Sequence, residues 1–426
     1  MLSADENDRT GVGCAVGRVI QINSIGETFM RRTNAMMKAW MVAGTALALL
    51  AGPATAQQKT VKIGFISTFS GPTAAIGNDM RNAFELGLDH LGRKLGGLPV
   101  EVIYEDDQQK PELGVQKTQK LIESDKVDFI AGYIWSNVLL ASLKTLVDSK
   151  TMTVDTNAGA SALSGALCSP YVFSTSWNND QTPSAMGMYM NQKGVKTAFL
   201  IGPNYAAGRD MLAGLKITYK GQIVGEEYTR WPDQLDFSAE LSKARAAKPD
   251  AIFVFYPGGA GVQFITQYVQ SGLKEQIPLY QVFTIDELSL PRLKDLALGI
   301  PGTQEWVNDL PNDANKRFVA DYIAKYKLRP SYYGAQSYDA ASLINSAVTA
   351  VKGDLTDKEG MRKEMEKANF KSVRGNFKFG NNHIPIQNFY LQDVAKDGDD
   401  YVLKTVATIV ENDQDRFHDQ CPMKPM

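Results

Sequence analysis

Apolar and polar positions follow two alternating rhythms along the first half of the chain. Residues 61–66 alternate and then run apolar, as a strand entering a sheet does, and the apolar positions of 73–95 recur at helical spacing. Further strand patterns lie at 98–104, 127–131 and 151–154, and helical patterns at 112–123 and 139–147. Strands that alternate with helices in this way predict a parallel sheet covered by helices on both faces.

The same rhythm restarts in a second unit, which joins the first near residues 171–179. Its strand patterns lie at 197–201, 222–228 and 251–256, and its helical patterns at 205–219, 237–246 and 262–273. Helical spacing returns over 313–369, and strands and hairpins are expected over 377–379 and 388–409. Because no low-complexity linker separates the units, we expect a hinge of several chain crossings, as in proteins whose cleft opens and closes.

The N-terminal residues have the three parts of a secretory signal. A positive start at 30–38 precedes an apolar run at 39–51, which is too short to span a bilayer as a helix. The small residues of 52–56 then predict cleavage before Gln57 and a periplasmic location. Residues 1–29 precede this signal, so we expect translation to begin at an internal methionine.

These patterns predict an α/β fold of two doubly wound α/β lobes joined by a multi-strand hinge. The expected parts are an N-terminal extension plus signal peptide at 1–56, lobe 1 at 57–177 and 310–372, lobe 2 at 178–309 and 373–410, and a C-terminal tail at 411–426.

Composition narrows the class of function. The 426 residues are 44% hydrophobic and 22% charged, which is typical of a globular chain of two domains. The 45 basic and 47 acidic residues form no block of like charge, so we expect no nucleic-acid partner. Three histidines and three cysteines supply a metal site poorly, and no common catalytic or nucleotide-binding motif occurs. We therefore expect no enzyme active site, no cofactor and no bound metal.

Cleavage of the signal leaves two cysteines, Cys168 and Cys421. An even pair in an oxidising compartment favours a disulfide, and two free buried thiols are the alternative.

Two loops that follow neighbouring predicted strands are suited to a small anion. The loop 132–137 ends where a helix begins, and the free N–H groups and the helix dipole there attract a carboxylate. Plain capping of that helix by Ser136 or Asn137 is the alternative. The loop 154–161 consists largely of small residues that let a ligand approach the backbone, although it also fits an ordinary surface loop. Both loops lie at the carboxyl ends of parallel strands, where open α/β sheets bind ligands.

Aromatic residues gather near the expected cleft, where each is either a ligand contact or part of the core. They are Tyr133, Trp135, Trp177, Tyr256, Tyr280, Phe283 and Tyr333.

Over 61–410 the chain resembles the type I periplasmic binding proteins of the branched-chain amino acid (leucine/isoleucine/valine-binding) family of ABC importers. The residues 61–72 are similar to the first strand and loop of that family, 105–107 to the end of its second strand, 175–181 to its first hinge crossing, and 250–273 to a strand–helix unit. The resemblance implies that fold, a small-molecule ligand, an ABC permease of the inner membrane as partner, and a monomer.

The resemblance also assigns candidate site residues. Ser136 falls where the family has a serine that holds the ligand carboxylate. In the next loop the family binds the ligand through one backbone group and one side-chain hydroxyl. These two positions fall on Asn157 and Gly159, so the hydroxyl is absent here. The family's acidic residue, which pairs with the ligand ammonium, falls on Gln281. The aromatic candidates that we add for the ligand are Trp135, Trp177, Tyr256 and Tyr333.

The carboxylate half of an amino acid site is thus partly kept, and the ammonium half is lost unless Asp155, Asp286 or Glu287 reaches the cleft. We predict a periplasmic substrate-binding protein for a small carboxylate. The ligand is an aromatic or apolar acid, or, as the runner-up, a branched-chain or aromatic amino acid. The alternative function is a periplasmic sensor that signals to a membrane receptor.

Overall fold

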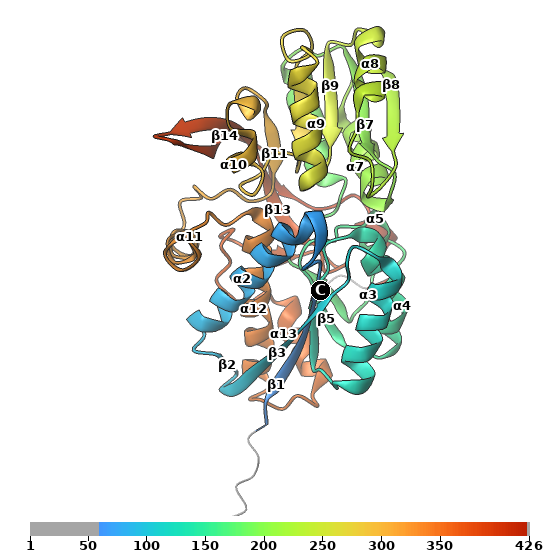
Figure 1. Cartoon of the computed structure of the whole chain (residues 1–426). Helices are drawn as coiled ribbons and strands as arrows, with labels where there is room; N and C mark the ends of the chain where they lie inside the picture. The colour runs from blue at the N-terminus through green and yellow to red at the C-terminus, as the bar shows by residue number, and fades with distance from the viewer. Residues whose placement is uncertain (1–58, 424–426) are drawn as a thin grey trace, which may run out of the picture. The chain divides into compact units, whose positions relative to one another are not determined.

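The computed structural model describes residues 59–423, whose strands form two sheets (Figure 1). The predicted signal peptide lies outside the described residues. Within 59–423, no helix is both long and apolar enough to cross a membrane.

The first lobe is built on a six-stranded sheet in the order β2-β3-β1-β4-β5-β6, parallel except for β2. Its strands are β1 (Val61–Ser67), β2 (Lys94–Leu95), β3 (Leu98–Asp106), β4 (Phe129–Gly132), β5 (Met152–Asp155) and β6 (Val172–Ser174). Its helices are the 3-10 helix η1 (Gly71–Thr73), α2 (Ala74–His90), α3 (Pro111–Gln119), the π-helix η2 (Lys120–Ser124), α4 (Ser136–Asp148), α5 (Ser161–Ser164), α11 (Asp313–Tyr326), α12 (Tyr332–Ala350) and α13 (Lys358–Glu366). Figure 1 shows α3 and α4 on one side of the sheet and α2 and α12 on the other, so the apolar strands are covered on both faces.

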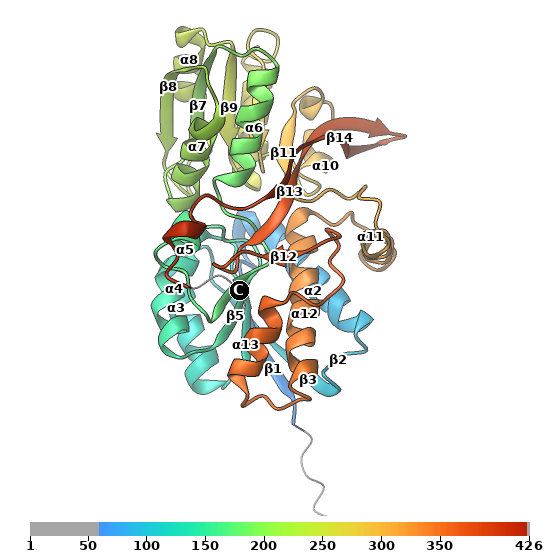
Figure 2. The same cartoon turned by 180° about the vertical axis from the view of Figure 1, so that it is seen from behind.

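The second lobe is built on an eight-stranded sheet in the order β12-β13-β11-β10-β9-β7-β8, with β14 paired to β13 (Figure 2). Its strands are β7 (Thr197–Pro203), β8 (Gln222–Thr229), β9 (Ala251–Phe255), β10 (Leu279–Val282), β11 (Gly302–Gln304), β12 (Lys378–Phe379), β13 (Pro385–Asp397) and β14 (Asp400–Asp413). Its helices are α6 (Gln181–Gln192), α7 (Ala206–Thr218), α8 (Ser238–Ala247), α9 (Gly259–Gln270), α10 (Leu290–Leu293) and the 3-10 helix η3 (Lys294–Ala297); a further 3-10 helix, η4 (His418–Gln420), lies in the tail. The strands β7 to β11 are parallel, and β12 to β14 are antiparallel.

Three chain crossings join the lobes, which confirms the predicted hinge of several strands. They follow β6, β11 and α13 along the chain. The guanidinium of Arg374 in the third crossing donates to the carbonyl oxygens of Thr175 and Ser176 in the first, at 2.5 and 3.3 Å. The amide of Asn312 in the second crossing donates to the carbonyl of Val373 in the third, at 2.9 Å. Hydrogen bonds therefore tie the three crossings to one another.

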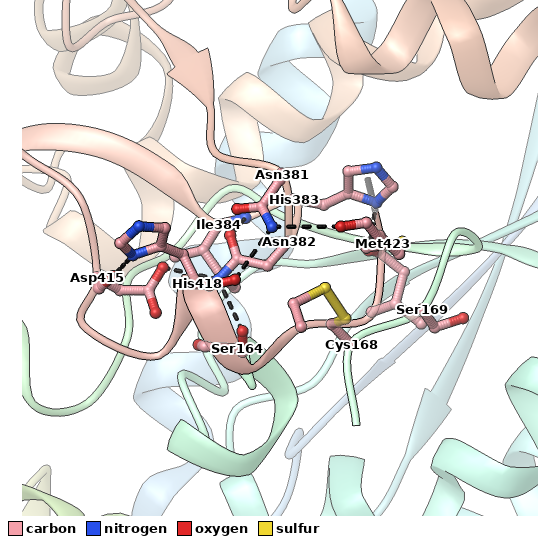
Figure 3. The surroundings of a disulfide bond; sticks show 12 residues. Ser164, Cys168, Ser169, Asn381, Asn382, His383, Ile384, Asp415, His418 and Met423 are labelled. Atoms are coloured by element: carbon pink, nitrogen blue, oxygen red, sulfur yellow. Dashed lines mark hydrogen bonds between the residues drawn. A yellow bond between two sulfur atoms is a disulfide. The ribbon is translucent and has the colours of Figure 1, made fainter. Parts of the chain in front are cut away.

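The predicted disulfide between Cys168 and Cys421 is present, with the two Cα atoms 5.7 Å apart (Figure 3). Asn382, in the loop between β12 and β13, also links the tail to the same part of lobe 1. The amide of Asn382 donates to the carbonyl of Ser164 at 2.8 Å and to Asp415 Oδ2 at 2.7 Å. The strand β14 ends at Asp413, so regular structure continues slightly beyond the expected start of the tail.

Candidate functional site

The loop after β4 turns sharply because of two residues with left-handed backbone. Gly132 has a φ of +111°, and a Cβ at this position would lie 2.1 Å from the carbonyl oxygen of Ile66, so only glycine fits. Tyr133 follows with a φ of +64°, and its buried hydroxyl is 2.6 Å from the Thr118 hydroxyl. This turn leads the chain directly into α4, where Ser136 is the first residue.

Ser136 does not cap α4. The residue at the cap position is Trp135, whose indole N–H donates instead to the Thr68 hydroxyl at 2.8 Å. The N–H of Val138 donates to the carbonyl of Trp135 at 3.0 Å, and the two N–H groups before it have no acceptor within the helix. The start of α4 therefore presents the backbone donors and the positive dipole end that a carboxylate needs.

The loop after β5 is held in place by Asp155. The carboxylate of Asp155 accepts hydrogen bonds from the N–H groups of Asn157 and Ala158 at 3.2 and 2.8 Å and from the Ser174 hydroxyl at 3.0 Å. Burial raises the pKa of Asp155 to about 7, although these hydrogen bonds act in the opposite direction. The amide of Asn157 donates to the carbonyl of Ile134 at 2.8 Å, which joins this loop to the one after β4.

A small cavity lies where these loops meet residues of the second lobe. Its volume is about 20 Å³, whereas a single water molecule needs roughly 10–15 Å³ on the same scale. A larger ligand therefore requires the walls to move apart. The cavity is lined by Ile134, Trp135, Ser136, Asn157, Trp177, Asn179, Tyr205, Ala207, Met211, Phe255, Pro257, Phe283, Tyr332 and Tyr333.

Half of the lining residues are aromatic, and their rings come from both lobes. Trp177 of the first lobe stacks on Phe283 of the second, with ring centroids 4.4 Å apart. Phe283 also packs against Tyr332 at 4.9 Å, and Trp135 meets Tyr205 edge-on at 6.4 Å. Flat surfaces of this kind favour an aromatic ring in stacked or edge-to-face contact.

The lining contains polar groups but no Asp, Glu, Lys, Arg or His within the described residues. One of the polar atoms, Asn157 Oδ1, is buried and has no hydrogen-bond partner within the described residues. Because buried polar groups in proteins are usually hydrogen-bonded, this atom is available to a ligand.

Five of the eight predicted ligand contacts line this cavity: Trp135, Ser136, Asn157, Trp177 and Tyr333. The structure places Gly159, Tyr256 and Gln281 outside the lining. Gly159 shapes the hinge instead, because its carbonyl accepts from the N–H of Asn179 at 2.7 Å and a Cβ would lie 2.5 Å from the carbonyl oxygen of Trp177.

Tyr256 and Gln281 have structural partners within lobe 2. The Tyr256 hydroxyl lies 2.7 Å from the Thr229 hydroxyl, and its ring packs on Phe237 with the centroids 4.8 Å apart. The side-chain oxygen of Gln281 accepts from the N–H groups of Thr284 and Ile285 at 2.8 and 3.2 Å, so it stabilises the turn after β10.

The acidic residues considered as substitutes for the missing ammonium partner are buried and lie outside the lining. Asp286 accepts from the N–H of Ser289 at 2.7 Å, and burial raises its pKa to about 6. Glu287 accepts from the amide of Asn308 at 2.9 Å, and burial raises its pKa well above the usual value. Neither residue lines the cavity, nor does Asp155, although the charge of Asp286 acts on Tyr332 and Tyr333 of the lining.

Sequence reasoning missed several lining residues, notably Asn179, Tyr205, Phe255 and Tyr332. The available signals were the position of Asn179 in the first hinge crossing and the place of Tyr205 directly before a predicted helix. No group of His, Cys, Asp and Glu suited to a metal ion occurs within 59–423.

Two α/β lobes, a hinge of three crossings and an inter-lobe cavity define a two-lobed solute-binding protein. A family model described as periplasmic binding protein matches residues 60–399, and the chain belongs to this family. It is a type I periplasmic binding protein of the branched-chain amino acid family, whose members are non-enzymatic binding proteins of ABC transporters. Membership of this family implies a periplasmic location.

Relatives include the Leu/Ile/Val-binding protein homolog 6 of Brucella melitensis, which is 29% identical over 86% of this chain and 96% of the relative. A solute-binding protein of an ABC transporter from R. palustris, solved in complex with benzoate, is 32% identical with a TM-score of 0.81, covering 86% of this chain and all of the other. A solute-binding protein of an ABC transporter from Rhodopseudomonas palustris BisB5, solved in complex with 3,4-dihydroxy benzoic acid, is 29% identical with a TM-score of 0.79. The match covers 84% of this chain and 99% of the other.

Proposed function

We propose that this protein captures aromatic carboxylates in its inter-lobe cavity and delivers them to an ABC permease of the inner membrane. The aromatic ring lies between the rings of the two lobes, and the carboxylate lies at the start of α4 beside Ser136. We further propose that the mature chain begins at Gln57 and acts as a monomer.

The observation that carries this proposal is the cavity lining, which is rich in aromatic rings and has no acidic side chain. An amino acid ligand brings a buried ammonium, and desolvation of that charge is costly unless an opposite charge lies close to it. A carboxylate alone is served by the helix start and the hydroxyl of Ser136.

The similar proteins support a carboxylate ligand but divide over its class. The two R. palustris structures hold benzoate and 3,4-dihydroxy benzoic acid, whereas the Brucella relative is named for leucine, isoleucine and valine. Identities of 29–32% do not decide between them, so the choice rests on the lining of this chain.

A thermal-shift screen of the mature protein tests the proposal. Benzoate, 4-hydroxybenzoate and 3,4-dihydroxybenzoate should each raise the Tm by several degrees, because a ligand at 100 times its Kd stabilises the folded state by about 2.7 kcal/mol. Leucine, isoleucine, valine and phenylalanine at equal concentrations should give a much smaller shift. A clear shift with the amino acids and none with the aromatic acids would overturn the proposal.

A further inference from the structure

The amide of Asn179 is held in one orientation by its neighbours. Asn179 is 1% exposed, and its side-chain oxygen accepts from the indole N–H of Trp177 at 3.3 Å. An indole nitrogen can only donate, so the oxygen of the amide must face Trp177 and its nitrogen must face the other way. That nitrogen donates to the hydroxyl oxygen of Ser136 at 3.1 Å and to Asp210 Oδ2 at 3.0 Å.

The bond from Asn179 decides the role of the Ser136 hydroxyl. Since the amide nitrogen of Asn179 has no acceptor capacity, Ser136 must accept in this contact, and its own O–H is left to donate. Ser136 lines the cavity at the start of α4. A ligand carboxylate at that place then meets a hydroxyl oriented as a donor, which suits an anion that only accepts.

Asp210 connects this arrangement to the other lobe. It lies on α7 of lobe 2, whereas the residues that donate to it belong to the hinge and to lobe 1. Besides Asn179, the N–H of Ser161, the first residue of α5, donates to Asp210 Oδ2 at 3.1 Å. The same helix supplies Ala207 and Met211 to the cavity wall, so movement of α7 away from lobe 1 opens the cavity and breaks the bond from Ser161.

We infer that Asn179 and Asp210 are positioning residues that couple lobe closure to the orientation of the Ser136 hydroxyl. When the lobes close, Asp210 holds the amide of Asn179, and the amide turns the hydroxyl proton of Ser136 toward the ligand anion. This inference rests on the proposed function, because it requires a carboxylate at Ser136. Asp210 itself does not line the cavity. The Asn179 amide donates to Asp210 and to the Ser136 hydroxyl, and only that hydroxyl donates to the ligand. The carboxylate of Asp210 and the carboxylate of the ligand therefore do not share a donor.

A double-mutant cycle with benzoate as the calorimetric probe tests the first link. Asn179→Ala should weaken binding about 5- to 10-fold, on the scale of one hydrogen bond. The double variant with Ser136→Ala should bind within about twofold of Ser136→Ala alone, because Asn179 acts through that hydroxyl. Losses that multiply in the double variant would show independent roles and overturn the inference.

The second link is tested at Asp210. Asp210→Asn keeps an oxygen that accepts from Asn179 and Ser161, so this variant should bind benzoate nearly as well as wild type. Asp210→Ala has no such oxygen, so its affinity for benzoate should fall by as much as that of Asn179→Ala. Equal affinity of the Ala variant and wild type would overturn the coupling between lobes.

The matched control is Asn191→Ala, since Asn191 also bonds on both sides of its amide, to Thr218 and Lys220, but lies outside the cavity lining. Its affinity should equal that of wild type, and urea denaturation identifies any variant that has lost its fold. If Asn179→Ala is unfolded, Asn179→Leu, which is uncharged, similar in size and offers Ser136 no N–H, replaces it in the cycle. Wild-type protein that binds none of benzoate, 4-hydroxybenzoate and 3-phenylpropanoate would instead overturn the proposed function, and this inference with it.

Discussion

Replacing Cys168 and Cys421 by serine is expected to lower the free energy of unfolding by about 2–4 kcal/mol. The disulfide joins residues 253 positions apart in the sequence, so it removes many conformations from the unfolded chain. The tail also keeps hydrogen bonds to Asn381 and Asn382 of the loop between β12 and β13, and Asn382 in turn donates to the carbonyl of Ser164 in lobe 1; the substitutions leave these bonds in place. The loss therefore reflects the covalent link more than the contacts around it.

Urea denaturation of the mature protein measures this effect. Wild-type protein treated with a reductant should unfold at the same urea concentration as the double serine variant, because both lack the same bond. Benzoate affinity should change little, since neither cysteine lines the cavity. Equal unfolding free energies with and without the disulfide would contradict the prediction.

Replacing Ser136 by alanine is expected to weaken the binding of benzoate by about 1–3 kcal/mol, which is the usual loss for a hydrogen bond to a charged group. This corresponds to a roughly 5- to 150-fold rise in Kd. The side chain is 2% exposed and does not cap α4, so its removal should leave the stability of the helix nearly unchanged.

Ser149→Ala is a matched control at the opposite end of α4, where the hydroxyl bonds to the carbonyl of Leu146 at 3.0 Å. Isothermal titration calorimetry should show wild-type affinity for this variant. If Ser136→Ala also bound benzoate with wild-type affinity while remaining folded, Ser136 would have no part in holding the carboxylate.

Much of the fold was predictable because local periodicity sets most of its elements. The apolar runs at 197–201 and 251–256 became β7 and β9, and the helical spacing of 205–219 became α7. The elements that the patterns did not reveal are short or, like the twelve-residue helix α6, directly follow a hinge crossing. The strands β6 and β11 have three residues each, too few to show a period, and each lies directly before a crossing.

The site was harder to predict, because successive residues of a strand point to opposite faces. Phe255 and Tyr256 follow one another at the end of β9, and both are aromatic; the structure places Phe255 in the cavity and Tyr256 in the lobe 2 core. The chain then turns after β10, where Phe283 has a φ of +54° and reaches the cavity while Gln281 faces that turn. The direction of such side chains depends on tertiary packing, which the sequence pattern does not contain.

The most direct test of the account compares ligands that differ only by an amine. Calorimetry of the mature protein with 3-phenylpropanoate and phenylalanine, and with 4-methylpentanoate and leucine, isolates the contribution of the ammonium group. We expect each amine-free acid to bind at least about tenfold more tightly than its amino acid, because the lining has no acid to pair with a buried ammonium. Tighter binding of phenylalanine and leucine than of their amine-free counterparts would contradict the account.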